Sequence, residues 1–386
     1  MAKFLQSIKE KILLKIKTAF FVIPVILLGF FIFLPRGATT ENRVNPPWIK
    51  LTKEGFVKGG KPFKFIGANA VNIVFYDDWD LDVEKAIRTA KENNISVLRL
   101  YIDLGWGKDD DFDRIFDIAS KNGMYIILAF TDCCCSGDYA NLKKYFQVHA
   151  PFCNITNEQS VRAFKKLIKQ IIERKNSLNN RVYRDDPTIL AWEIANELEY
   201  SLFAESEVRK WVDGIARYIK TLDKNHLVTI GISTNNLESI NNKALLKIFD
   251  SSALDFFSFH FYPSSGPVDY SKNTLFENTQ RIDSITKRFL SLGKPVIMAE
   301  FGFSNSVDLN EKMKAEPGTV DFYILTFKEY MDAAFYAGCS GIMFWGWGVP
   351  EAKRVPMWWS KEDYSIVDKK FCNFLKNYHI PEDDER

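Results

Sequence analysis

Two glutamates in the sequence are candidates for catalytic residues. Glu197 ends the segment 192–197 and Glu300 follows the apolar residues 297–299. The two segments end the predicted strands 189–194 and 295–299, so each glutamate is expected to lie at a strand end. Facing carboxylates can cleave a glycosidic bond, because one protonates the departing oxygen while the other meets the anomeric carbon. We predict Glu197 as acid/base and Glu300 as nucleophile, with carboxyl groups about 5 to 5.5 Å apart. Glu193, earlier on the same strand, is expected to be a structural partner inside the fold.

Other polar residues fall at equivalent strand ends. A buried Arg99 needs a carboxylate partner, and Glu300 is the natural one. Tyr262 is expected to donate a hydrogen bond to Glu300, while His260 either sets the proton balance of the site or is a satisfied core histidine. Asn196 is expected to hold the 2-hydroxyl of the sugar at the cleaved bond.

Tryptophans could supply flat surfaces for sugar rings. Trp345 is the last residue of the eighth predicted strand and is the candidate for the floor beneath the cleaved sugar. Trp106 and Trp347 are candidates for further sugar contacts, although packing tryptophans are commoner than sugar platforms. The proposed chemistry needs no metal ion and no organic cofactor, and we expect neither.

Strand-like and helix-like segments alternate along the chain, which predicts a parallel sheet. The predicted strands are 63–69, 97–101, 125–130, 189–194, 227–231, 256–259, 295–299 and 341–345. The predicted helices include 83–93, 112–121, 160–175, 208–223 and 320–337. Eight such units indicate an α/β fold, a single-domain (β/α)8 TIM barrel, with its chemistry at the C-terminal ends of the strands. A preceding pair, 49–53 and 56–58, is expected to form a hairpin that closes the barrel floor.

The composition excludes some partners. A formal net charge of +2, from 51 basic and 49 acidic residues, gives no field that would attract nucleic acid. No glycine-rich phosphate loop follows the first strand, which argues against a nucleotide-binding fold. We expect a monomer whose partners are a polysaccharide or oligosaccharide substrate and, through its N-terminal helix, a membrane.

The N-terminal residues are predicted to form a membrane anchor. A lysine-rich segment, 1–17, precedes the uncharged apolar span 18–35, which is near the lower limit for crossing a bilayer. Basic residues stay on the cytoplasmic side, so the catalytic domain, 48–386, is expected outside the cell membrane after a linker at 36–47. The alternative is a cleaved signal peptide and a secreted enzyme.

Cysteines and glycosylation motifs fit an outward-facing chain. Cys133, Cys134, Cys135 and Cys153 allow a disulfide that closes a long loop, with free thiols as the alternative. Asn94 and Asn154 each begin an acceptor motif for N-glycosylation.

The strand-end residues and their surroundings resemble family 5 of the glycoside hydrolases, in clan A, whose members are retaining enzymes on (β/α)8 barrels. The likeness is densest at 183–197, 218–223 and 226–231, and it looks most like the endo-β-1,4-mannanase branch. The resemblance implies Glu197 as acid/base and Glu300 as nucleophile. Its supporting shell is Arg99, Asn196, His260, Tyr262 and Trp345. The chain departs from that branch after Glu197, where residues 198–200 replace the usual proline and polar continuation.

Three functions fit these features. The first is an endo-β-1,4-mannanase that works by double displacement through a covalent glycosyl-enzyme. The second keeps the chemistry but is a glucanase, an exo-β-glycosidase or a transglycosylase. The third is a non-catalytic carbohydrate-binding barrel, which the presence of both glutamates disfavours. An open cleft would indicate endo action, and the loop 132–157 is the obvious segment to block it.

Overall fold

The computed structural model describes most of the chain beyond residue 45. The described residues are 46–53, 55–70, 73, 82–102, 109–131, 154–198, 202–234, 246–247, 249–263, 274–303, 319–347 and 369–382. The predicted basic segment 1–17, membrane span 18–35 and four clustered cysteines lie outside them. None of the helices in the described part is long and apolar enough to span a membrane.

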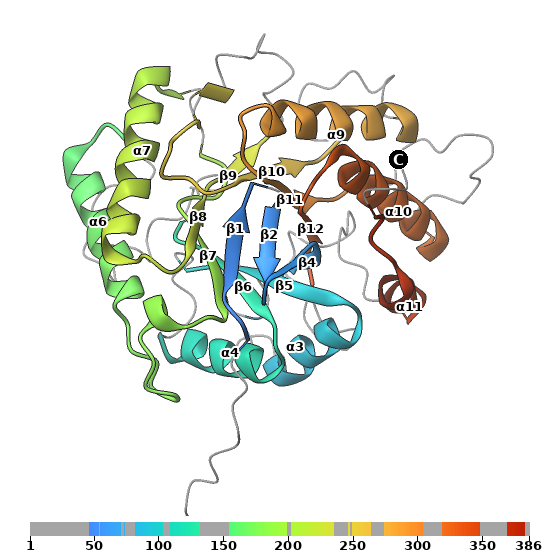
Figure 1. Cartoon of the computed structure of the whole chain (residues 1–386), viewed down its shortest axis with the longest axis horizontal. Helices are drawn as coiled ribbons and strands as arrows, with labels where there is room; N and C mark the ends of the chain where they lie inside the picture. Colours follow the sequence, from blue (N-terminus) through green and yellow to red (C-terminus); the bar gives the residue numbers. More distant parts are fainter. Residues whose placement is uncertain are drawn as a thin grey trace, which may run out of the picture. The chain divides into compact units, whose positions relative to one another are not determined.

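Nine strand segments form one parallel sheet around a central axis (Figure 1). They are β4 (Phe65–Asn69), β5 (Ile95–Tyr101), β6 (Tyr125–Ala129), β7 (Ile189–Glu193), β8 (Leu227–Thr229), β9 (Gly231–Ser233), β10 (Phe257–Phe261), β11 (Val296–Phe301) and β12 (Gly341–Trp345). Segments β8 and β9 are one strand interrupted at Ile230, since β8 pairs with β7 and β9 pairs with β10. The sheet therefore closes into an eight-stranded barrel, as the sequence predicts.

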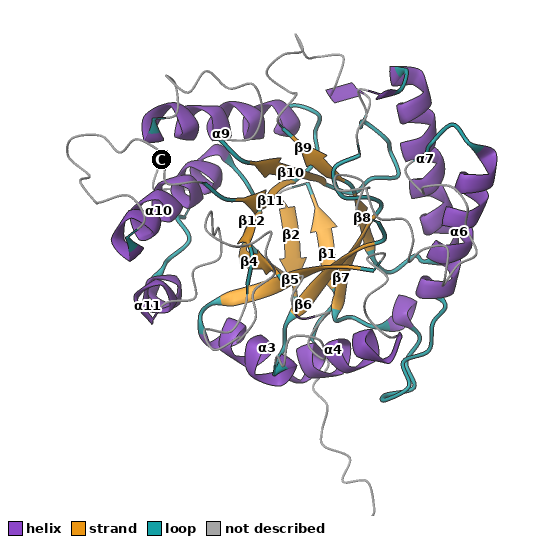
Figure 2. Cartoon of the chain, turned by 180° about the vertical axis from the view of Figure 1, so that it is seen from behind, coloured by secondary structure: helices purple, strands orange, loops and turns teal. Residues whose placement is uncertain are grey.

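Helices surround the barrel (Figure 2). The described ones are α3 (Val83–Glu92), α4 (Asp109–Lys121), α6 (Glu158–Ile172), α7 (Glu205–Leu222), α9 (Leu275–Leu290), α10 (Val320–Ala337) and α11 (Lys369–Asn377), with the short 3-10 helix η2 (Tyr183–Asp185). All five predicted helices are present, and α9 and α11 add to them. Side-chain caps fix several starts: the Asn157 carboxamide accepts from the Ser160 amide, and Thr274 and Glu277 form a capping box.

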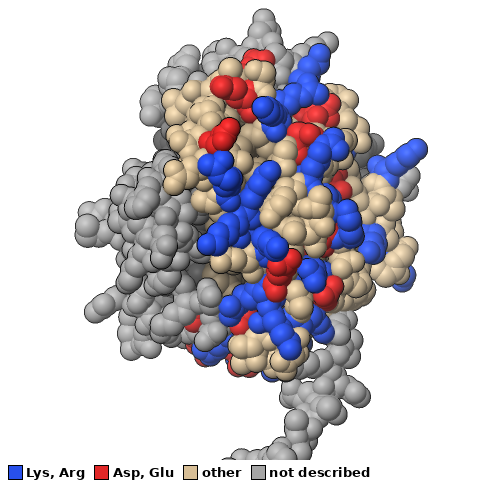
Figure 3. All heavy atoms as spheres, turned by 90° about the vertical axis from the view of Figure 1, so that its left-hand side faces the viewer, with Lys and Arg blue, Asp and Glu red and all other residues tan. Residues whose placement is uncertain are grey.

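The outer helices are amphipathic. The inward face of α7 buries Val208, Trp211 and Ile215, which recur at helical spacing. On the opposite side, Lys and Arg side chains of the α6 and α7 face lie among acidic ones (Figure 3). Several of these cations pair with an acid one turn away, as Arg162 does with Glu158. The surface there is a solvated helix face on which basic side chains outnumber acidic ones.

A hairpin covers the end of the barrel where the strands begin. Strands β1 (Ile49–Thr52) and β2 (Gly55–Lys58) pair antiparallel, and β3 (Lys61–Pro62) continues the small sheet. Ile49 and Phe56 are buried in a cluster of inward residues from the barrel strands, and the Phe56 ring lies 5.1 Å from that of Phe256. The expectation that the hairpin closes the floor is confirmed.

The barrel interior changes character along each strand. In β5, Val97 packs in the apolar cluster near the hairpin, whereas Arg99 and Tyr101 point to the same side farther along. Side chains two residues apart share one face of a strand, so this alternation sends polar groups to the far end of the barrel.

Candidate active site

Glu197 is placed by the sharp end of the fourth barrel strand. Its φ of 44° lies in the left-handed region, which side-chain-bearing residues seldom adopt. The Asn196 amide donates to the carbonyl of Thr131 (2.8 Å), and the Glu197 amide donates to that of Gly231 (3.1 Å). Bonds to the neighbouring strands on both sides hold the turn and present the Glu197 side chain over the barrel mouth.

Glu300 is aimed by an irregularity in the seventh barrel strand. The pairing of β10 with β11 shifts by one residue, so that Phe259 lies opposite Met298 but His260 lies opposite Glu300. Strict alternation from Ile297, which packs in the barrel interior, would turn Glu300 toward the helices. A bulge re-aims a side chain in this way, and Glu300 accordingly points into the barrel mouth.

Arg99 sits between two carboxylates beneath the site. Its side chain is fully buried, its Nε donates to Glu193 Oε2 (2.7 Å), and its Nη2 donates to the other oxygen of Glu193. Its Nη1 donates to Glu300 Oε1. Burial alone would lower the pKa of Arg99, but its acidic neighbours outweigh burial and the pKa is raised well above its ordinary value. The predicted pairing of Arg99 with Glu300 is seen, and Glu193 contacts the same guanidinium inside the barrel.

Neutral groups complete the surroundings of Arg99. Asn69 accepts from Nη1 (2.8 Å) and Asn196 accepts from Nη2 (2.7 Å). The Asn69 amide in turn donates to the backbone carbonyl of Ala299 (2.9 Å), which ties β4 to β11. Each donor of the guanidinium therefore has an acceptor, as a buried charge requires.

Gly231 makes room for this network. A Cβ at that position would lie 2.6 Å from Glu193 Oε1 and 3.1 Å from both Arg99 Nη2 and His260 Cε1. The first distance is shorter than side chains tolerate, so only glycine fits where the fifth barrel strand passes the ion pair.

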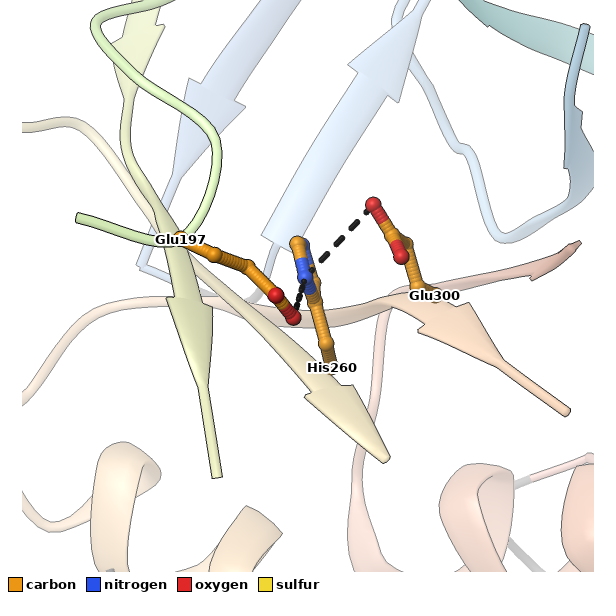
Figure 4. A group of neighbouring side chains, drawn as sticks. All are labelled: Glu197, His260 and Glu300. Carbon is orange, nitrogen blue, oxygen red and sulfur yellow. Dashed lines mark hydrogen bonds and ion pairs between the residues drawn. The ribbon is translucent and has the colours of Figure 1, made fainter. Parts of the chain in front are cut away.

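His260 links the two glutamates (Figure 4). Its Nδ1 lies 2.8 Å from Glu197 Oε1 and 3.5 Å from Glu300 Oε1. One oxygen of each glutamate and one His260 nitrogen all lie within 4.8 Å of one another. These are donor types that also bind metals, but here Arg99 already supplies a positive charge beside Glu300.

Tyr262 donates to the second oxygen of Glu300, Oε2, at 2.9 Å. Burial, then the nearby carboxylates of Glu300 and Glu197, raise the pKa of Tyr262 well above its ordinary value. The phenol therefore stays protonated and remains a hydrogen-bond donor at neutral pH. This is the contact expected for Tyr262 from the sequence.

The tryptophans predicted to contact sugar lie in different environments. Trp345 ends β12 at the barrel mouth, is partly exposed, and its ring meets that of Tyr101 edge-on at 6.4 Å. Trp347 is fully buried, and its indole N–H donates to the backbone carbonyl of Ala86 in α3 (3.0 Å). The prediction that Trp347 contacts substrate is therefore corrected to a packing role. Trp106 lies outside the described residues.

Sequence reasoning missed Tyr101. Its hydroxyl donates to Glu300 Oε1 (2.7 Å) and accepts from Arg99. The signal was available, because Tyr101 follows Arg99 by two residues on one strand and must share its face. Asn69 was also missed; it is the last residue of the first barrel strand and lies level with the other site residues.

The arrangement defines a class of enzyme. Two glutamates at the C-terminal end of a (β/α)8 barrel, with one oxygen of each no more than 4.8 Å apart, are the apparatus of a retaining glycosidase. Residues 83–370 match the family model described as GH family 5 beta-mannosidase-like. The chain belongs to this family of glycoside hydrolases.

Known proteins agree with this assignment. The chain is 28% identical to mannan endo-1,4-beta-mannosidase 1 of Arabidopsis thaliana, over 83% of this chain and 87% of that protein. The fold is similar to that of the endo-1,4-beta-D-mannanase from Thermotoga petrophila, with a TM-score of 0.65 and 21% identity over 82% of this chain and 99% of the other. It is also similar to that of a family 5 mannosidase from Rhizomucor miehei, with a TM-score of 0.63 and 19% identity over 86% and 96%.

Proposed function

We propose that this chain is an endo-β-1,4-mannanase in which Glu197 is the acid/base and Glu300 the nucleophile. The observation that carries the mechanism is the spacing of the two glutamates, since one carboxyl oxygen of each lies within 4.8 Å of the other. An inverting enzyme needs roughly 6.5 to 9.5 Å, because a water molecule must fit between the carboxylate and the sugar. The spacing leaves room for direct attack by the carboxylate.

The reaction proceeds in two displacements. Glu300 attacks the anomeric carbon while Glu197 protonates the departing oxygen, which gives a covalent glycosyl-enzyme. Glu197 then takes a proton from water, and the water oxygen replaces Glu300 on the same carbon. His260, whose Nδ1 lies 2.8 Å from Glu197 Oε1, orients that carboxyl group through both steps. Trp345 provides the floor under the sugar, and Asn196 faces its 2-hydroxyl.

The names of the relatives support mannan as the substrate, since proteins from Arabidopsis thaliana and Oryza sativa that resemble this chain are named mannan endo-1,4-beta-mannosidases. The test incubates the purified chain with mannan, glucan, xylan and aryl β-glycosides, and follows reducing ends and product lengths. Rapid release of short oligosaccharides from mannan alone supports the proposal. Cleavage of only another glycan would retain the mechanism and reject the substrate.

Exo-acting β-mannosidase is the second candidate, favoured by the description of the matching family model as beta-mannosidase-like. The product lengths separate the two. An endo enzyme releases a spread of oligosaccharides and rapidly lowers the viscosity of mannan. An exo enzyme releases mannose from the first minutes and leaves the viscosity nearly unchanged.

The role of Glu197 has its own test. Glu197→Ala should lose activity on mannan but still release an activated phenol in the first step, because such a leaving group needs little protonation. Pre-steady-state release of phenol from an aryl β-mannoside measures that step. Equal loss on both substrates would count against Glu197 as the acid/base.

We propose further that residues 18–35 anchor the enzyme in the cell membrane with the catalytic domain outside. Support comes from the lysine-rich segment before an uncharged apolar span. Extraction of cell membranes at alkaline pH should leave the chain in the pellet, with its N-terminal peptides still present by mass spectrometry. A soluble chain that begins after residue 35 would favour the secreted alternative.

A further inference from the structure

Tyr101 has a hydroxyl whose orientation is fixed by its neighbours. The side chain is 3% exposed, and the Arg99 guanidinium carbon lies 4.8 Å from the centre of its ring. Arginine can only donate hydrogen bonds and a carboxylate can only accept them. The Tyr101 oxygen therefore accepts from Arg99 Nη1, and its proton goes to Glu300 Oε1, 2.7 Å away.

The two oxygens of Glu300 are consequently unequal. Oε1 accepts from both Arg99 and Tyr101, and His260 Nδ1 approaches it at 3.5 Å. Oε2 accepts from Tyr262. Hydrogen bonds to an anionic oxygen withdraw its electron density and occupy its lone pairs, so the oxygen with fewer donors is the better nucleophile. Oε2 is therefore the oxygen that attacks the sugar.

We infer that Tyr101 is a positioning residue that reserves Glu300 Oε2 for attack and stabilises the carboxylate when it leaves. The inference rests on the proposed role of Glu300. In the first step the Oε2–carbon bond forms as the glycosidic carbon–oxygen bond breaks, and the departing oxygen takes the proton of Glu197. In the second, water oxygen bonds to that carbon, its proton goes to Glu197, and the electron pair of the carbon–Oε2 bond returns to Glu300.

The Tyr101 hydrogen bond acts differently on the two steps. Negative charge leaves the carboxylate during attack and returns to it during hydrolysis of the glycosyl-enzyme. Loss of a charge-assisted bond to Oε1 should therefore slow the second step by about 10- to 100-fold. The first step should change little, because the same loss makes the free carboxylate a stronger nucleophile.

Tyr101→Phe tests this with whichever activated aryl β-glycoside the wild-type full-length enzyme hydrolyses. With such a substrate the second step limits turnover, so kcat and KM should both fall by about 10- to 100-fold while kcat/KM stays within about threefold. Mass spectrometry of the intact protein at steady state should show the glycosyl-enzyme as the main species. An unchanged or raised KM together with a fall in kcat/KM would overturn the inference.

Tyr125→Phe is the matched control. It removes the same atom from a buried tyrosine, whose hydroxyl donates to the Pro47 carbonyl (2.7 Å) at the hairpin end of the barrel. Its kcat and KM should equal those of the wild type. If Tyr101→Phe does not fold, as judged by circular dichroism, 3-fluorotyrosine at position 101 replaces it. The more acidic phenol donates more strongly, so kcat and KM should rise together; a fall in kcat would contradict the inference.

Glu300→Ala separates failure of this inference from failure of the proposed function. If Glu300→Ala remains active, the assignment of the nucleophile is wrong and the inference falls with it. If Glu300→Ala is inactive but Tyr101→Phe lacks the joint fall in kcat and KM, only the role of Tyr101 is rejected.

Discussion

The two ends of the barrel are built by the same strands and hold opposite kinds of side chain. At the hairpin end, Ile49 and Phe56 pack against inward apolar residues such as Phe256. At the other end, Arg99, Glu193 and Glu300 form a buried ionic network. The apolar end gains stability from burial, whereas the ionic end bears the cost of removing charges from water. Changes at the first should therefore affect unfolding alone, whereas changes at the second should affect catalysis, and also unfolding where they leave a buried charge without its partner.

Glu300→Ala gives the largest expected effect. Loss of the nucleophile should lower kcat/KM on every substrate by about 10⁴-fold or more. Arg99 keeps its two bonds to Glu193, so the midpoint of thermal unfolding should change little. Steady-state kinetics and calorimetry measure the two quantities. A large fall in the melting temperature would show that the ionic end also carries much of the stability.

Glu193→Gln should lower both the unfolding free energy and kcat/KM. It leaves a fully buried Arg99 with one carboxylate fewer, and breaking a buried pair costs about 3 to 5 kcal/mol of unfolding free energy. Arg99 is then free to shift toward Glu300, so kcat/KM should also fall. Urea denaturation and kinetics on one preparation measure both. Unchanged activity would mean that Glu193 serves the fold alone.

Phe56→Ala is the matching change at the hairpin end. Removal of this buried ring should lower the unfolding free energy by about 3 to 5 kcal/mol and leave kcat/KM at its wild-type value. Urea denaturation and kinetics below the transition test it. A loss of activity in the folded variant would mean that the two ends are coupled through the strands.

The smallest expected effect is at Asp113, which lies outside the barrel interior. Its contribution to the unfolding free energy should depend on pH. Burial would raise its pKa, but hydrogen bonds from Arg174, Tyr183 and Ser177 outweigh burial, so the pKa lies below the ordinary value of 3.8. The cluster of Asp113 and these three donors contributes its full stabilisation when the pH is above 3.8. That contribution is lost as the pH falls through the lower pKa that Asp113 has in the folded state.

Asp113→Asn should therefore lower the unfolding free energy at pH 7 by about 2 to 3 kcal/mol. Relative to the wild type, the deficit should shrink as the pH drops from about 5 toward 2. Urea denaturation at several pH values measures this difference. A constant deficit would show that the carboxylate charge is not what stabilises the cluster.

Much of the fold follows from sequence periodicity. The eight barrel strands and the closing hairpin are predictable, because alternating strand and helix patterns of this length admit few arrangements. Glu197, Glu300 and Arg99 are predictable as neighbours, since the C-terminal ends of the strands meet at one face. Helix α9 was not among the predicted helices, although Thr274 and Glu277 at its start form a capping box.

The direction in which individual side chains point depends on local irregularities that sequence periodicity does not reveal. The one-residue shift between β10 and β11 turns Glu300 inward, against strict alternation. Trp347 stands only two residues after Trp345, yet its indole is buried against α3. Tyr101 was overlooked because a tyrosine at the end of an apolar strand looks like packing until its hydroxyl is seen between two charges.

The central claim is that Glu300 attacks the sugar. An activated 2-deoxy-2-fluoro-β-mannoside tests it most directly, because the fluorine slows both displacements and the good leaving group restores the first, so the intermediate accumulates. After proteolysis, mass spectrometry should find the sugar on the peptide that contains Glu300, and Glu300→Gln should remain unlabelled. Label on the peptide that contains Glu197, or turnover without any covalent species, would contradict the account.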